Sequence, residues 1–256
     1  MLTDKERENE MERHTGQKNG FWFRGEHSSD YHLFVEKYPD QKSGTRRRTT
    51  FKIPGRSGYL HAEENAYDNY QLPYECYFHS PEPTPDAVRK ILAWLNQPGY
   101  SKLYDNYGTE FFRYASFVGP LDVENHLNRY GRCTIIFDCA PQCYLWSGQD
   151  AYAFDSPSFI ANPTRFNAKP LLVVYGFGPG NVTVGNKTVE IKDLEDMIIL
   201  DSESENAYRQ LGDAAAENKN GSIYAPEFPE LIPGENPISW DGGITSVLIT
   251  PRWWTL

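Results

Sequence analysis

Apolar and polar residues alternate in short stretches along most of the chain after Gly20, and Gly, Pro or polar clusters separate these stretches. The pattern is typical of β-strands, because a strand with one buried face repeats every two residues. In the first part of the chain it predicts strands at residues 21–24, 31–36, 48–53 and 71–79. The first two are expected to form a β-hairpin across a short polar connection.

One segment, residues 84–97, shows a helical period instead. Four apolar residues there recur at i, i+3, i+4 and i+7 and share one face: Val88, Ile91, Leu92 and Leu95. Thr84 is a suitable N-cap and Pro85 fits the first turn. Pro98-Gly99 is expected to end the helix, which we expect to pack over a sheet.

Further strands are predicted at residues 102–104, 111–118 and 132–139, and Ala140-Pro141 is expected to end the last of these. The second half continues with strands at residues 171–175, 181–184, 187–191, 197–201 and 246–251. Gly185-Asn186 indicates a tight hairpin, and residues 202–221 indicate a long polar loop. The fold class is therefore mainly β, with one α-helix in a β-sandwich-like or barrel-like first domain. The second half has the spacing of a β-sandwich or jelly roll.

Composition and charge restrict the possible partners. The net charge of −10 over 256 residues argues against nucleic-acid binding by the whole chain. Residues 1–20 are charged and lack the apolar core of a secretory signal, and they are predicted to form a flexible arm. No apolar run approaches the ~18 residues of a membrane span. The 17 tyrosines suit a protein with extensive interfaces, although strands alone also favour aromatic residues.

The cysteines and the glycine-rich run do not indicate a catalytic or metal centre. Cys139 and Cys143 have three residues between them, and no C-x-x-C or H-x3-H motif lies nearby to complete a zinc site. All four cysteines are expected to be reduced and buried. The run at residues 176–180 lacks the Lys and Ser/Thr of a phosphate loop, so a turn between strands is the better interpretation.

Two groups of polar residues deserve comparison with known site patterns. Asp201, Glu203 and Glu205 alternate as calcium ligands do, but the glycine of a calcium loop is missing. The segment beginning at His61 is His-Ala-Glu-Glu rather than the His-Glu-x-x-His of a zinc protease. We therefore expect no catalytic residues, no metal and no cofactor.

Arg46, Arg47 and Arg48 form a basic run. Arginine suits forked pairing with carboxylates, so the run can contact an acidic surface on a neighbouring chain; a solvated loop is the alternative. The candidate interface residues are Phe21, Trp22, Phe23, Arg46, Arg47, Arg48, Phe51 and Arg56.

Several segments, taken in order, resemble the distal tail proteins of siphophages, a component of the phage tail hub. The first half contains FWFRGEHSSDYHLFVEK, FKIPGRSGYL, ILAWLNQPGYSKLYD, FFRYASF and CTIIFDCAPQCY. The second half contains NPTRFNAKPLLVVYGFGPGNVTVGNKTV, MIILDSESENAY, FPELIPGENPISW and ITPRWWTL. No single segment is specific, and the resemblance rests on their order.

The resemblance implies a structural role without catalysis. Such proteins have a first β domain that forms a ring of six, expected here at residues 21–143, and a galectin-like β-sandwich, expected at residues 144–249. The last strand, residues 250–256, can return to the first domain. The implied partners are other copies of the chain, the tail tube protein, a tail-tip protein and receptor-binding proteins. The implied location is the tip of the virion tail, after synthesis in the host cytoplasm.

A carbohydrate-binding adhesin of the virion is the alternative function. In that case aromatic residues of the second domain, such as Trp240 or Tyr224, would stack on sugars.

Overall fold

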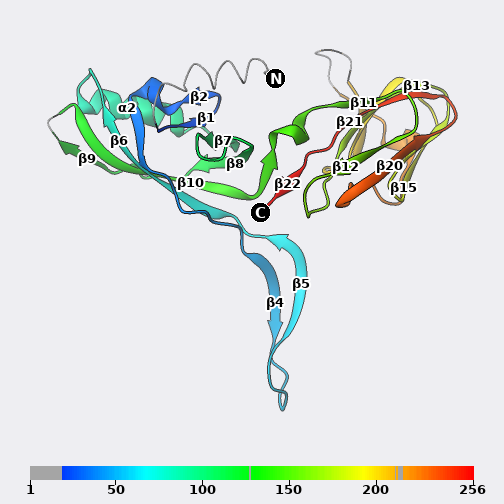
Figure 1. Ribbon diagram of the computed structural model, residues 1–256, viewed down its shortest axis with the longest axis horizontal. Helices are drawn as coiled ribbons and strands as arrows, with labels where there is room; N and C mark the ends of the chain where they lie inside the picture. Colours follow the sequence, from blue (N-terminus) through cyan, green and yellow to red (C-terminus); the bar gives the residue numbers. More distant parts are fainter. Residues whose placement is uncertain (1–18, 127, 211, 213–215) are drawn as a thin grey trace. The chain divides into compact units, whose positions relative to one another are not determined.

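The computed structural model describes residues 19–126, 128–210, 212 and 216–256, and most of them lie in antiparallel strands (Figure 1). The mainly β fold class is therefore confirmed. The predicted arm, apart from Asn19 and Gly20, lies outside the described residues. The contacts within the chain define two compact units, of which the first ends at Cys143 and the second spans Tyr144–Thr255.

The first unit is built on a nine-stranded sheet in the order β2-β1-β7-β8-β10-β6-β3, in which β9 and β22 also pair with β10. The strands of this sheet are β1 (Phe21–Phe23), β2 (Glu26–His27), β3 (Leu33–Lys37), β6 (Tyr70–His79), β7 (Ser101–Asp105), β8 (Phe111–Phe117), β9 (Val123–His126), β10 (Tyr130–Leu145) and β22 (Trp254–Thr255). Strand β22 and the last two residues of β10 belong to the second unit. A 3-10 turn, η1 (Ser28–Tyr31), precedes β3. A separate two-stranded sheet pairs β4 (Arg46–Phe51) with β5 (Leu60–Tyr67).

The predicted helix is present as α2 (Thr84–Leu95) and covers one face of the sheet. Its buried face is rotated from the predicted one and is centred on Ala87, Ile91, Trp94 and Leu95. The indole of Trp94 causes this rotation, because it stacks on Phe21 and its Nε1 donates a hydrogen bond to the Phe23 carbonyl oxygen at 3.1 Å. The N-cap position is Pro83, so the prediction that Thr84 caps the helix is wrong.

The prediction of a hairpin between the first two strands is also wrong. A two-residue loop, Arg24-Gly25, turns β1 back onto β2. Both loop residues have positive φ, +58° and +79°, which is the backbone of a type I′ turn and matches the twist of a tight hairpin. β1 also pairs with β7, whereas β3 pairs with β6. The two predicted strands therefore lie near opposite ends of the strand order in the sheet.

Strand β10 does not end at Ala140-Pro141 as predicted but continues to Leu145. Its ladder with β6 ends where Cys139 lies opposite Tyr70. Pro141 lies beyond that ladder, so its missing N–H removes no hydrogen bond between β10 and β6.

The four cysteines are buried and free, which confirms their predicted burial. Burial raises the pKa of the Cys133 and Cys139 thiols to about 12. It also raises the pKa of Cys143 and, well above its usual range, that of Cys76.

Because the thiolate is the nucleophile, we expect the folded chain to react only slowly with a disulfide reagent at pH 8. In denaturant all four cysteines should react at the rate of a free thiol. Spectrophotometric titration with Ellman's reagent measures both rates, and rapid labelling of the folded chain would contradict the buried positions.

The second unit is a sandwich of two antiparallel sheets. The six-stranded sheet has the order β11-β21-β13-β16-β17-β18 and the five-stranded sheet has the order β12-β20-β14-β15-β19. The strands are β11 (Tyr152–Phe154), β12 (Ser158–Asn162), β13 (Leu171–Phe177), β14 (Gly180–Val184), β15 (Lys187–Ile191), β16 (Glu195–Asp201), β17 (Asn206–Arg209), β18 (Glu217–Asn218), β19 (Ile223–Tyr224), β20 (Gly234–Trp240) and β21 (Ile244–Thr250). Two 3-10 turns, η2 (Trp146–Gln149) and η3 (Asn220–Ser222), complete the unit.

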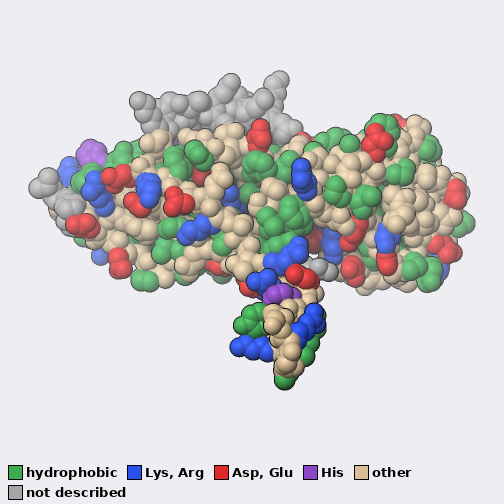
Figure 2. Space-filling view, turned by 60° about the horizontal axis from the view of Figure 1, so that its bottom comes forward, with side chains coloured by type: hydrophobic (Ala, Val, Ile, Leu, Met, Phe, Trp, Pro, Cys, Tyr) green, Lys and Arg blue, Asp and Glu red, His purple; other side chains and the backbone are tan. Residues whose placement is uncertain are grey.

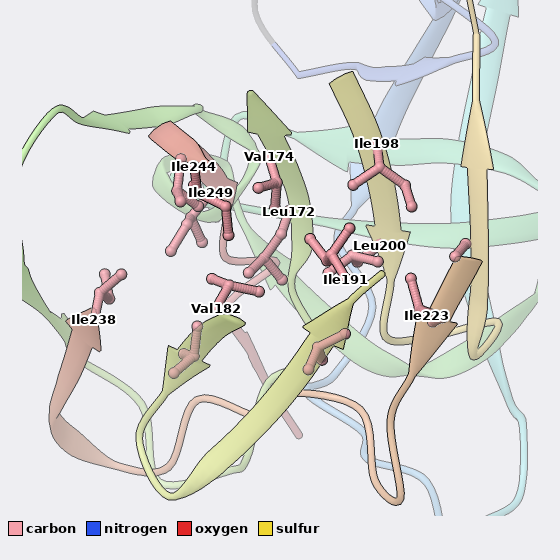
Figure 3. Packing of buried hydrophobic residues seen from close by; sticks show 14 of the residues in the cluster. Leu172, Val174, Val182, Ile191, Ile198, Leu200, Ile223, Ile238, Ile244 and Ile249 are labelled. Carbon is pink, nitrogen blue, oxygen red and sulfur yellow. The ribbon is translucent and has the colours of Figure 1, made fainter. Parts of the chain in front are cut away.

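The core of this unit lies between the two sheets, as Figure 3 shows. Leu172, Val174 and Leu200 point inward from one sheet, and Val182 and Ile191 point inward from the other. Inward and outward side chains alternate along these strands, as a sandwich requires. The interpretation of the second half as a β-sandwich is confirmed.

Two predicted connections in the second unit have different outcomes. The Gly185-Asn186 hairpin is confirmed, with β14 and β15 paired from Gly180↔Ile191 to Val184↔Lys187. The predicted polar loop at residues 202–221 instead contains β17 and β18, which extend the six-stranded sheet. Their side chains are mostly polar, so these two strands lack the apolar alternation by which a strand is recognised in a sequence.

Candidate assembly surface

The β4–β5 hairpin is the most exposed element of the first unit. Its two strands pair from Arg46↔Tyr67 to Phe51↔Leu60, with a bulge between Arg46 and Arg48, and they pair with no other described strand. The hairpin extends from the nine-stranded sheet (Figure 1). Every residue of β4 is exposed. A two-stranded hairpin without a core is marginally stable in water, so this one is suited to bind a partner.

The sequence at the tip fixes the reversal of the chain. The Arg56 N–H donates to the Ile53 carbonyl oxygen at 3.2 Å, which closes a four-residue turn. Pro54 occupies the second position, where its fixed φ is favourable, and Gly55 takes the third with φ of +79°. This arrangement is a type II turn, and it confirms the predicted Pro-Gly turn.

The distal half of the hairpin, residues 49–62, combines exposed apolar side chains with positive charge. Four large apolar residues are 41–57% exposed: Phe51, Ile53, Tyr59 and Leu60. The same segment contains Lys52 and Arg56 but no Asp or Glu. Figure 2 shows basic and hydrophobic side chains together along this hairpin. We call this segment the hairpin tip.

The base of the hairpin is electrically balanced. Arg46 pairs with Glu63 at 3.3 Å and also donates to the Tyr67 hydroxyl at 3.1 Å. Arg47 pairs with Asp68 at 2.5 Å. The hydrogen bonds to Tyr67 and Asp68 raise the pKa of the two guanidinium groups, so both stay cationic. These pairs are exposed and contribute little stability.

The eight candidate interface residues lie in two different environments. The structure buries Phe21, Trp22 and Phe23, with exposed fractions of 0%, 2% and 0%. Phe21 and Phe23 belong to the core beneath α2, and Trp22 stacks on Tyr104 at 5.0 Å. These three residues fill the interior of their own unit and are not available to a neighbour, which corrects that part of the expectation.

The other five candidates, Arg46, Arg47, Arg48, Phe51 and Arg56, are exposed on the hairpin. Three further residues of the tip, Ile53, Tyr59 and Leu60, were not predicted as interface residues. A signal for them was present, because a strand that enters a Pro-Gly turn needs a returning strand to pair with.

A groove lies on the face of the nine-stranded sheet that points away from α2, where Thr134 and Ile136 alternate with the buried side chains of β10. It consists of two adjoining hollows of about 590 and 400 Å³ that share Asp122 and Thr134. We call it the β6–β10 groove. Its carboxylates are Glu36, Glu75, Asp122 and Glu124, and its apolar lining includes Val118, Pro120, Val123 and Ile136.

The candidate catalytic and metal patterns of the sequence are occupied by structural contacts. Asp201 and Glu203 pair with Arg252 at 2.6 and 3.3 Å, rather than surrounding a cation. His61 lies on an exposed strand and not on a helix. Among the residues that the structure describes, no three His, Cys, Asp or Glu side chains are grouped to hold a metal ion.

The residues 176–180 form the end of β13, a turn and the start of β14, which confirms the predicted turn between strands. Gly176 has φ of +151°, and a Cβ there would lie 2.1 Å from the Gly243 carbonyl oxygen. The glycine is needed for this close approach of two backbones.

The two aromatic residues of the adhesin hypothesis differ in exposure. Tyr224 is 59% exposed, whereas Trp240 packs against the core of the sandwich. Trp240 is partly exposed, so its indole is less accessible to a sugar than the ring of Tyr224.

No family model and no curated protein matches this chain. Its structure is similar to that of SPP1 Dit (gp 19.1), described as a paradigm of the hub adsorption apparatus in phages that infect Gram-positive bacteria. The TM-score is 0.69, and the alignment covers 93% of this chain and 99% of that one. The chain has the fold of this phage hub protein.

The similarity to the hub protein extends over nearly the whole of both chains, at a sequence identity of 11%. It confirms, at the level of the fold, the resemblance that the ordered sequence segments indicated. No described helix has the length and apolar character that crossing a membrane requires.

Proposed function

We propose that this chain is a structural hub protein at the distal end of a phage tail. Six copies form a closed ring through the first unit, and the ring joins the tail tube to the tail tip and anchors host-recognition proteins. The similarity in fold to a phage hub protein over 93% of the chain is the observation that carries this proposal. The chain acts in the virion as a scaffold and catalyses no reaction.

The hairpin supports the ring because it provides one side of a head-to-tail contact. A ring needs interfaces between two different surfaces of the same chain that close by rotation. The extended chain from Arg46 to Ile53 spans about 23 Å, a large part of the width of a small domain. One copy can therefore reach the next with the hairpin tip while its own sheet receives the tip of the copy before it.

Exposed apolar area gives the contact its stability. The four large apolar side chains of the tip are between two-fifths and three-fifths exposed in the single chain. Their burial against a neighbour would contribute roughly 25 cal/mol per Å² of apolar surface covered. The arginines at the base contribute more to specificity than to affinity, and they make the association weaker at higher salt concentration.

We expect the purified chain to form a ring of six copies, visible as a closed particle by electron microscopy and as a sixfold mass by native mass spectrometry. A variant in which Asn-Gly replaces residues 49–62 should remain folded but stay as a single copy. The shortened loop joins Arg48 to Glu63, which lie opposite each other in the present register, so the base of the hairpin can still close.

A matched pair of variants separates the hairpin from general surface stickiness. Phe51→Ser with Leu60→Ser changes the tip, and Phe159→Ser with Phe177→Ser removes similarly exposed apolar side chains from the second unit. Only the first pair should disperse the ring. A wild-type chain that remains a single copy at high concentration would contradict the proposed ring.

A further inference from the structure

We propose that the β6–β10 groove is the surface that receives the hairpin tip of a second copy of this chain. The inference rests on the proposed ring and adds to it the identity of the acceptor surface. The hairpin tip and the groove lie on different parts of the first unit.

The charges of the two surfaces are complementary. The hairpin tip carries Lys52 and Arg56 with no carboxylate, on a chain whose net charge is −10. The groove is lined by four carboxylates and one guanidinium, that of Arg132. Arg132 pairs with Glu36 at 2.8 Å, and Lys37 approaches Glu75 at 3.5 Å. The net charge of the groove therefore stays negative even when Lys37 is counted with Arg132. A positive tip is attracted to this surface and held in one orientation.

The apolar parts of the two surfaces also match. The hollow nearer to Gly119 is lined by Val118, Pro120 and Ile136, which leaves partly exposed apolar surface beside the acidic part. The tip presents Phe51 and Leu60 as a cross-strand pair. An apolar centre with a charged rim is the usual composition of a specific protein interface.

The groove has the geometry to accept an extended segment. Its two hollows are continuous, because Asp122 and Thr134 line both. Together they follow the outward residues of β10 from Arg132 to Ile136. The hairpin tip can lie along the two hollows and place Lys52 or Arg56 beside the carboxylates of the groove.

The acceptor is tested by crosslinking within the assembled full chain. A photoreactive phenylalanine analogue replaces Ile53, which is 41% exposed at the tip. Mixed rings of isotope-labelled and unlabelled copies distinguish crosslinks between copies from those within one copy. We expect crosslinks between copies to fall on the lining of the groove, within residues 118–136, within residues 71–76 or at Glu36. Crosslinks between copies that fall elsewhere in an intact ring would overturn the groove while leaving the proposed function in place.

A charge exchange gives a second, independent test. Lys52→Glu with Arg56→Glu should weaken association about tenfold or more, and so should Glu75→Lys with Glu124→Lys, because each places like charges together. Combining all four substitutions in one chain should restore assembly. Arg165→Glu with Lys192→Glu, at exposed positions of the second unit, makes the same change in net charge and should have no such effect.

The outcomes separate the two levels of the proposal. Loss of assembly in the tip variant, with no recovery in the fourfold variant, would overturn the groove as acceptor. A wild-type chain that never associates would overturn both the groove and the ring.

Discussion

The Phe21→Ala variant is expected to lose about 3–5 kcal/mol of unfolding free energy in the first unit. The ring of Phe21 is fully buried and lies 5.0 Å from Tyr74, 5.5 Å from Phe137 and 5.7 Å from Trp94, measured between ring centroids. Alanine would leave a cavity where the sheet and α2 meet, and large aromatic rings cannot close around it without leaving their rotamers. Denaturant unfolding measures the loss, and hydrogen exchange of β1, β6 and β10 assigns it to the first unit.

Phe51→Ala provides the matched control, because it removes the same side chain from the hairpin, where Phe51 is 49% exposed. It should change the unfolding free energy by less than about 0.5 kcal/mol. If Phe21 were an interface residue, its replacement would leave the stability of the single chain unchanged and would weaken association instead. That result would contradict the buried position.

Asn236→Ala is expected to destabilise the second unit by about 2–4 kcal/mol, because several backbone groups would lose their partners. The Asn236 side chain is fully buried on β20. Its Nδ2 donates to the carbonyl oxygens of Ile232 and Gly234 at 2.8 and 2.9 Å, and its Oδ1 accepts from the Ile232 N–H at 2.9 Å. The side-chain amide of Asn236 thus fixes the backbone from Ile232 to Gly234, which leads into β20.

Asn236→Leu distinguishes hydrogen bonding from cavity formation, because leucine has the same branched shape as asparagine, with larger methyl groups in place of the polar atoms. We expect it to be destabilised about as much as Asn236→Ala in thermal and denaturant unfolding. Recovery of wild-type stability in Asn236→Leu would mean that the space, and not the amide, matters at this position.

Elements with local signals were predictable from the sequence. The α2 helix, the Pro54-Gly55 turn and the β14–β15 hairpin each depend on residues within a few positions of one another. Proline and glycine impose backbone angles whatever the rest of the chain does. The buried strand β10 was recognisable for a related reason, since its apolar residues are nearly continuous.

Pairings between distant segments were not predictable. Whether β3 pairs with β1 or with β6 depends on which partner completes a common core, and the sequence near β3 does not encode that choice. Strand β5 was missed because its residues, LHAEENAY, do not alternate regularly between apolar and polar. Its only pairing partner among the described strands is β4, so it needs no apolar face.

The candidate assembly surface was predicted in part. The arginines at residues 46–48 indicated it, because a run of charged residues is seldom buried. The aromatic residues at 21–23 were predicted to lie at the interface but are buried in the core, because an aromatic run suits an interface and a core equally well. The β6–β10 groove could not be found in the sequence, because its carboxylates come from β3, β6 and the segment before β10, and only folding brings them together.

The unpaired edges of the β4–β5 hairpin also affect the tendency of the chain to aggregate. Each outer edge offers backbone N–H and C=O groups to any extended peptide, including the hairpin edge of another copy. The closely spaced charges of the base and the bulge between Arg46 and Arg48 interrupt a regular edge. They discourage strand-by-strand stacking into fibres, so the hairpin of the proposed ring is protected against joining copies edge to edge.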